Sequence, residues 1–122
     1  MTTPRGRLGQ WGEAHARRYL EGQGYTVSDT NYRSRWGEVD IVARQGGELV
    51  FVEVRTRRGS GFGTPEESVT AAKSRRLIAT AQDYLQKRGL ERSAWRIDLV
   101  SIHLDSGGKL LEVNHLENAV GE

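Results

Sequence analysis

Two acidic residues on neighbouring predicted strands carry the clearest chemical signal in this sequence. Asp40 and Glu53 lie on either side of a Gly-Gly pair at 46–47, and glycine tolerates the positive φ of a two-residue hairpin turn. With that turn, Asp40 faces Glu53, and residues directly opposite have Cβ atoms about 4.5–5.5 Å apart. Two like charges at that distance destabilise a hairpin unless a cation neutralises them, and carboxylate oxygens are what Mg²⁺ takes. The pair therefore predicts a divalent-metal site.

The proposed turn sets the register of the whole hairpin. Gln45 then pairs with Glu48, and Glu38 faces Arg55. Because side chains alternate along a strand, Glu38 shares one face with Asp40, and the apolar residues pack on the other face. Those apolar residues are Val39, Ile41, Val50, Val52 and Val54. The alternative is two solvated carboxylates on an exposed face, and a slip of two residues would separate them. We favour the site because clustered charge costs stability.

Glu13 lies on the apolar face of the first predicted helix, with Gly9, Ala16 and Leu20. A charge on a face that packs against a sheet is costly unless it is paired or bound to a metal. The alternative is a glutamate at the edge of the stripe that extends to water. Periodicity does not decide between the two.

Lys73 lies between Val69 and Leu77, on the apolar stripe of the second long helix. It either points at the acid pair or extends its stem to water, and the spacing alone slightly favours water.

The remaining polar and aromatic residues give weaker signals. The histidines His15, His103 and His115 share no metal-ligand spacing and are expected at the surface or at strand ends. Asp98 alternates with apolar residues and is expected to pair with Arg96 in a structural role. The Trp and Tyr residues are expected in the core or at its edge rather than as platforms for base stacking, although Trp36 lies beside the site and could contact a substrate.

The elements that must position these side chains follow the order α-β-β-β-α-β-β. Such an order predicts an α/β fold with a mixed central sheet flanked by helices. The expected helices cover residues 6–23 and about 70–88, and the expected strands cover 25–33, 37–44, 48–56, 94–103 and 109–115. A Gly-rich basic loop at 57–63 and a short turn at 65–68 precede the second helix.

Composition predicts one domain over residues 1–122, with its core at about 6–119. The absence of cysteine rules out a disulfide framework and a Cys-based zinc site. No signal-peptide or membrane-spanning pattern occurs, so we expect a soluble cytoplasmic protein. The net charge is only +2, but fifteen of the eighteen basic residues are Arg, whose planar fork matches phosphate oxygens. A GC-rich genome would favour Arg codons equally.

Several segments together resemble a known family. Gly37-Glu38-Val39-Asp40 followed by Phe51-Val52-Glu53-Val54-Arg55 resembles the Asp…Glu-x-Lys core of the PD-(D/E)XK nuclease superfamily. The whole chain is similar to the YraN-like family within it. That likeness runs through the helix segment from Gly9 to Leu20, Asn31-Tyr32-Arg33, Val69-x-x-x-Lys73, Arg96-Ile97-Asp98 and Asn118-Ala119.

The resemblance implies a restriction-endonuclease-like fold and a metal-dependent nuclease site, similar in layout to archaeal Holliday-junction resolvases. By that likeness Asp40, Glu53 and the Val54 carbonyl would bind Mg²⁺ or Mn²⁺, and Glu13 would complete the site. Arg55 departs from the motif, because a guanidinium is not deprotonated in proteins and cannot act as a base. Arg55 is left to stabilise charge, and Lys73 to supply the missing amine.

The function expected from this resemblance is hydrolysis of DNA phosphodiesters, on branched or flapped DNA. Four arginines are expected to bind the DNA backbone without sequence readout: Arg57, Arg58, Arg75 and Arg76. The alternative is a non-catalytic nucleic-acid-binding module on a nuclease scaffold. A homodimer is compatible with the superfamily, in which dimerisation is common, but the sequence shows no clear interface.

Overall fold

The computed structural model describes residues 4–59 and 69–120, with side chains from residue 9 onward. The elements, in chain order, are α1 (Pro4–Gly22), β1 (Thr26–Ser34), β2 (Gly37–Gln45), β3 (Glu48–Arg58), α2 (Ala71–Lys87), β4 (Ala94–Leu104) and β5 (Leu110–Leu116). This is the order expected from the sequence, with boundaries that differ by one or two residues. The turn expected at 65–68, and the part of the Gly-rich loop beyond residue 59, lie outside the described residues.

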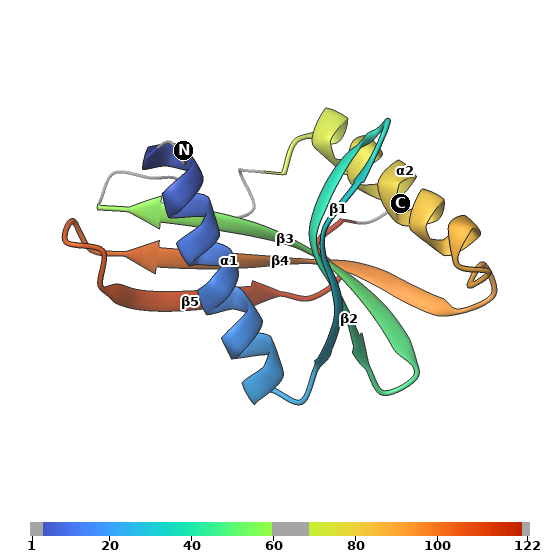
Figure 1. Ribbon diagram of the computed structural model, residues 1–122, viewed down its shortest axis with the longest axis horizontal. Coiled ribbons are helices and arrows are strands. Elements are labelled where there is room, and N and C mark those ends of the chain that lie inside the picture. Colours follow the sequence, from blue (N-terminus) through green and yellow to red (C-terminus); the bar gives the residue numbers. More distant parts are fainter. Residues whose placement is uncertain (1–3, 60–68, 121–122) are drawn as a thin grey trace.

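The five strands form one mixed sheet in the order β1-β2-β3-β4-β5 (Figure 1). Only the β3–β4 pair is parallel, running from Glu48↔Ala94 to Arg58↔Leu104. A parallel pair needs a crossover connection, and α2 lies on the segment that makes it. The sequence expectation of an α/β fold with helices against a mixed sheet is confirmed.

The hairpin between β2 and β3 forms as the Gly-Gly pair predicts. Gly46 has φ of 60°, and the register runs from Gln45↔Glu48 to Ile41↔Val52. Beyond Ile41, the described ladder continues only with β1, and the end of the β1–β2 hairpin bends toward α2 (Figure 1). Because of this bend, Val39 packs in the α2-side cluster, so its expected place beside Ile41 was wrong.

Two apolar clusters cover opposite faces of the sheet. On one face, Ala16 and Leu20 of α1 pack against Ile41, Val52 and further residues of β2, β3 and β4. On the other face, residues of α2 pack against Phe51 and Val42. The α2 residues in this cluster are Leu77, Ala81, Tyr84 and Leu85. Strands β2 and β3 are thereby held between two helices.

Gly12 allows α1 to approach the sheet closely. A Cβ at Gly12 would overlap the Thr56 side chain of β3, whereas a Cβ at Gly9 would meet nothing within 4 Å. This close approach sets the height of the next residue, Glu13, above the sheet.

The ends of α2 follow the expected signals. Thr70 Oγ1 accepts a hydrogen bond from the Lys73 N–H at 3.1 Å, which satisfies one of the free amide donors of the first turn. After Lys87 the chain turns through Gly89 at φ 66°. The cap fixes the first turn of α2. It therefore also fixes the backbone position from which the Lys73 side chain extends.

Across the described ranges, neither α1 nor α2 combines the length and the apolar character that a membrane-crossing helix requires.

Candidate metal and phosphate site

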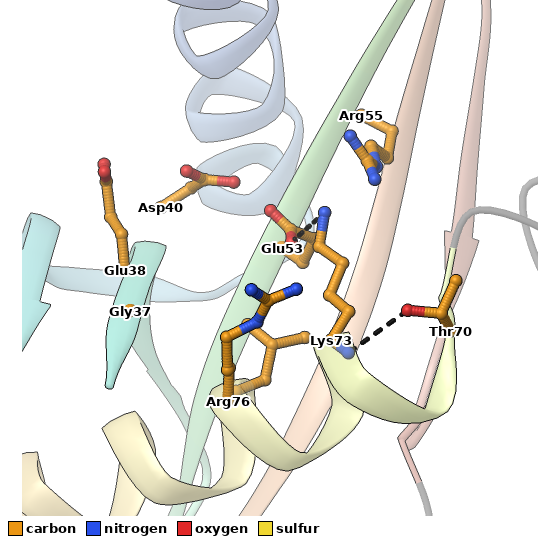
Figure 2. Close-up of a pocket in the computed structure, with 9 residues that line it drawn as sticks. Gly37, Glu38, Asp40, Glu53, Arg55, Thr70, Lys73 and Arg76 are labelled. Carbon is orange, nitrogen blue, oxygen red and sulfur yellow. Dashed lines mark hydrogen bonds and ion pairs between the residues drawn. The ribbon is translucent and has the colours of Figure 1, made fainter. Parts of the chain in front are cut away.

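A pocket of about 520 Å³ opens where β2, β3 and the first turns of α2 meet (Figure 2). Acidic side chains enter it from the strands, and basic side chains enter it from β3 and α2. Its lining residues are Gly37, Glu38, Asp40, Glu53, Arg55, Thr70, Lys73, Arg76 and Leu77. The pocket therefore brings together four of the five residues expected to take part in catalysis, all but Glu13, and one of the four expected DNA-binding arginines.

Asp40 and Glu53 are close enough to interact directly. The Val54 N–H donates a hydrogen bond of 2.7 Å to Asp40 Oδ2, which draws the Asp40 carboxyl across to β3. Burial, followed by the hydrogen bond and the negative charge of Glu53, raises the pKa of Asp40 from 3.8 to about 9. The Asp40 carboxyl therefore favours its protonated form, and a bound divalent cation would favour the charged form.

Glu13 of α1 lies close to Asp40. This matches one of the two positions expected from the sequence, the one beside other polar groups rather than the one at the edge of the stripe in water. The acidic cluster consists of Glu13, Glu38 and Asp40. Each of them has one carboxylate oxygen that lies within 4.8 Å of the corresponding oxygens of the other two. Burial is the largest cause that raises the pKa of Glu13, and the charge of Glu38 adds to it. With its amide turned so that nitrogen faces the acids, Asn31 donates to Glu38 Oε1 at 3.0 Å and to Glu13 Oε1 at 3.1 Å.

Glu38 is the acidic residue of the cluster that the sequence analysis did not select. It was expected opposite Arg55, but it forms an ion pair with Arg33 at 3.3 Å and points to the same side as Asp40 (Figure 2). The expectation failed because the β2–β3 ladder does not extend to that position. Its place two residues before Asp40 on one strand face was the available signal.

Lys73 points at the acid pair. Its Nζ lies 2.8 Å from Glu53 Oε2, and the two side chains are only 22% and 11% exposed (Figure 2). The slight preference for water that helical spacing suggested was therefore wrong. The strand register brings Glu53 to the α2 side of the sheet, where the stripe that carries Lys73 packs.

Arg55 and Arg76 line the same pocket from β3 and α2 (Figure 2). The Val54 N–H points to this edge of β3, where it bonds Asp40. The role expected for the Val54 carbonyl as a metal ligand stays a prediction.

The other expected DNA-binding arginines do not line the pocket. Arg57 donates to Ser101 Oγ at 3.4 Å, and the Arg58 guanidinium lies 5.9 Å from the centre of the Trp11 ring. Arg75 is exposed on α2 next to Arg76. These three positions are available only for contacts beyond the pocket.

The donor set fits a hard divalent cation. It consists of carboxylate oxygens of Glu13 from α1 and of Glu38 and Asp40 from β2, with Glu53 of β3 beside Asp40, and the Asp40 carboxyl is destabilised in its charged form. Carboxylate-only sets with no histidine or cysteine suit Mg²⁺ or Mn²⁺ rather than zinc.

Comparison with known proteins places the chain in a family. A model described as uncharacterised protein family UPF0102 matches residues 12–102. The chain belongs to UPF0102.

Full-length relatives agree with the assignment. UPF0102 proteins of Dehalococcoides mccartyi and Roseiflexus castenholzii are each 46% identical, covering 100% of this chain and 99% of their own length. A UPF0102 protein of Moorella thermoacetica is 46% identical over 98% of this chain and 99% of its own. The segment that matches the UPF0102 model includes every acidic residue of the pocket as well as Lys73. The UPF0102 description assigns no activity, so function must be argued from the site.

A second polar cluster of this UPF0102 chain is buried beneath the end of β5. Asp98 is fully buried and accepts hydrogen bonds from Arg96 Nε at 2.9 Å and from the Asn118 N–H at 2.9 Å, and it lies 2.7 Å from His115 Nε2. The pKa of Asp98 is lowered, because the bonds to His115, Arg96 and Asn118 outweigh its desolvation. The structural pairing expected for Asp98 and Arg96 is confirmed. His115 is not a surface histidine, since its side chain is only 8% exposed.

Proposed function

We propose that this protein is a metal-dependent endonuclease that hydrolyses DNA phosphodiester bonds, with branched or flapped DNA as its substrate. The observation that carries the proposal is the meeting of Asp40 and Glu53 in a pocket whose opposite wall is cationic. The cationic wall can bind the negative charge of a phosphodiester. A metal on the acidic wall can activate a water that attacks its electrophilic phosphorus. The family resemblance of the motif supports the same chemistry.

The acidic wall would hold Mg²⁺ or Mn²⁺. Asp40, Glu53 and the Val54 carbonyl are the ligands we assign, and Glu13 from α1 would bind the ion or one of its waters. When bound, such an ion polarises a phosphate oxygen and makes water more acidic. Asn31 holds Glu13 and Glu38 in place through its amide, which fixes the acidic wall before substrate arrives.

The cationic wall would bind the scissile phosphate. In hydrolysis a water oxygen bonds to phosphorus, the bond from phosphorus to the leaving oxygen breaks, and a proton reaches that oxygen. Negative charge grows on the phosphorus-bound oxygens in the transition state, and fixed guanidinium and ammonium groups stabilise it. Arg55, Arg76 and Lys73 line the pocket in positions for this role, and Lys73 carries the amine that the motif places two residues after Glu53.

A nucleic-acid-binding module without catalysis is the second candidate, and Arg55 is the observation that favours it. Arg55 stands where the motif has Lys, and a guanidinium stays protonated in proteins, so it cannot accept a proton from water as a base. Such a module would bind DNA in a salt-dependent manner, with no metal requirement and no cleavage.

The test is incubation of the protein with labelled junction, flap and linear DNA in Mg²⁺ or Mn²⁺, with EDTA as control. We expect cleavage that requires the metal and that is faster on junction or flap than on linear duplex. Asp40→Asn and Glu53→Gln should each abolish it, because each removes a negative ligand.

Glu21→Gln is the matched control, since Glu21 is an exposed acid of α1 that pairs with Arg17. It should cleave like wild type. Cleavage that persists in Asp40→Asn would reject the site assignment, and metal-independent binding without cleavage would favour the binding module.

A further inference from the structure

An exposed tryptophan stands one residue before the pocket lining. Trp36 is 45% exposed, and the next residue, Gly37, lines the pocket. Among the described residues the other large apolar side chains with comparable exposure are Trp11, Leu110 and Leu111, none of which adjoins a lining residue in the sequence. The expectation that tryptophans lie in the core or at its edge was therefore wrong for Trp36 and Trp11.

The turn that carries Trp36 is fixed to α2. Ser34 Oγ accepts a hydrogen bond of 3.0 Å from the Trp36 N–H and lies 3.1 Å from Thr80 Oγ1. Thr80 is fully buried and donates to the Arg76 carbonyl at 2.8 Å. The tryptophan therefore projects from a turn that the Ser34–Thr80 hydrogen bond joins to α2.

Arg35 lies against the indole, and two further arginines lie on the neighbouring elements β1 and α2. The Arg35 guanidinium lies 4.3 Å from the centre of the Trp36 ring, which orders the indole by a cation–π contact. The Arg33 side chain on the adjoining strand is 77% exposed, and Arg76 of α2 is exposed as well. An aromatic face beside guanidinium groups is the combination that binds single-stranded nucleic acid, because bases stack on the ring and phosphates pair with the charges.

We infer that Trp36 is a stacking platform for an unpaired base of DNA next to the scissile phosphate. The inference rests on the proposed nuclease function and deepens it, because it assigns the preference for flapped or branched DNA to one residue. In a continuous duplex every base is stacked on its neighbours, so the indole gains little from it. At the point where a strand leaves the duplex, one base is free to stack on Trp36 while Arg35 and Arg76 bind its flanking phosphates.

The experiment compares DNA binding by wild type, Trp36→Ala and Trp36→Phe in EDTA, which prevents cleavage. The probes are a linear duplex and the same duplex with a single-stranded flap, carrying 2-aminopurine at the first unpaired position. Wild type should bind the flap more tightly than the duplex and quench the 2-aminopurine. Trp36→Ala should weaken flap binding by about tenfold or more and lose the quenching, with duplex affinity changed less than about twofold. Trp36→Phe keeps an aromatic face and should retain part of both signals.

Trp11→Ala is the matched control. Trp11 is 48% exposed and also has an arginine, Arg58, near its ring, but it lies outside the pocket. It should bind and quench like wild type.

The outcomes separate this inference from the function on which it rests. Equal flap binding by wild type and Trp36→Ala, or an equal loss on flap and duplex, would overturn the stacking role and leave the nuclease proposal standing. Failure of wild type to bind any of the DNAs would overturn both.

Discussion

Lys73 of α2 and Glu53 of β3 form an ion pair of 2.8 Å that joins the crossover helix to the acidic strand. The pair places an ammonium group next to the carboxylate that also faces Asp40. In the motif that this chain resembles, the amine comes from the same strand as the glutamate, at the position that Arg55 occupies here. In this chain the amine in the pocket is that of Lys73, and it therefore comes from α2 instead of β3.

Replacement of Lys73 tests its place in the chemistry. Lys73→Met should reduce cleavage by about 10²- to 10³-fold, because a cationic group directed at the phosphate is lost. Lys73→Arg should recover part of the rate, since it restores the charge. The measurement is single-turnover cleavage of flap DNA at saturating Mn²⁺.

Lys87→Met controls for a lost charge on α2, because Lys87 is exposed and pairs with Asp83. Its rate should equal that of wild type. A Lys73→Met variant as fast as wild type would show that Lys73 only neutralises Glu53.

The raised pKa of Asp40 predicts how the metal-free protein responds to pH. Between pH 3.8 and about 9 the folded chain holds a proton on Asp40 that the unfolded chain has released. The free energy of unfolding should therefore fall as pH rises through this window, and the raised pKa of Glu13 acts in the same direction. Urea unfolding in EDTA at a series of pH values measures the slope.

Asp40→Asn should flatten this slope and should stabilise the metal-free protein at pH 8 by about 1–2 kcal/mol, because the neutral asparagine amide needs no proton uptake on folding. A slope that is unchanged in Asp40→Asn would place the titrating group elsewhere.

Gly12→Ala should push α1 away from the sheet, because the new methyl group overlaps Thr56. We expect a loss of about 1–3 kcal/mol in the free energy of unfolding. Mn²⁺ affinity should fall as well, since Glu13 moves with the helix. Gly9→Ala is the control: it meets no neighbour and should stabilise the helix by up to about 1 kcal/mol. Equal stability of the two variants would contradict the close approach of α1.

Removal of the buried Asp98 carboxylate should lower the free energy of unfolding. It should have no direct effect on cleavage. Asp98→Ala leaves Arg96 and His115 without their shared partner, and breaking such a buried pair costs about 3–5 kcal/mol. Glu21→Ala breaks an exposed pair with Arg17 and should cost at most about 1 kcal/mol. Thermal unfolding of both variants is the measurement, and equal losses would refute the role of the buried cluster.

The β2–β3 hairpin was predictable because it depends on local information: a Gly-Gly turn fixes which residues of β2 and β3 face each other, and the period of two then assigns their sides. The described ladder ends at Ile41↔Val52, one pair before Asp40 and Glu53, so the meeting of these acids depends on the Val54 N–H bond to Asp40 as well as on the turn.

The end of that ladder was not predictable in the same way. It accompanies the bend of the β1–β2 hairpin toward α2, which places Val39 in the other cluster and pairs Glu38 with Arg33.

Contacts between distant elements explain the other differences. Helical spacing placed Lys73 on the stripe of α2, but which strand residue lies beneath it depends on how the crossover helix packs. His115 shares no short spacing with Asp98, and their contact exists only because β5 pairs antiparallel to β4. Trp36 is exposed because the turn after β1 is tied to Thr80, a residue of another element.

Calorimetric titration of the metal-free protein with Mn²⁺ at about pH 8 tests the central claim most directly. We predict saturable binding in wild type, accompanied by proton release, because the cation displaces the proton held on Asp40. Asp40→Asn and Glu53→Gln should lose this binding, and Glu21→Gln should keep it. Absence of Mn²⁺ binding in wild type, or equal affinity in Asp40→Asn, would contradict the assignment of a metal to this pocket.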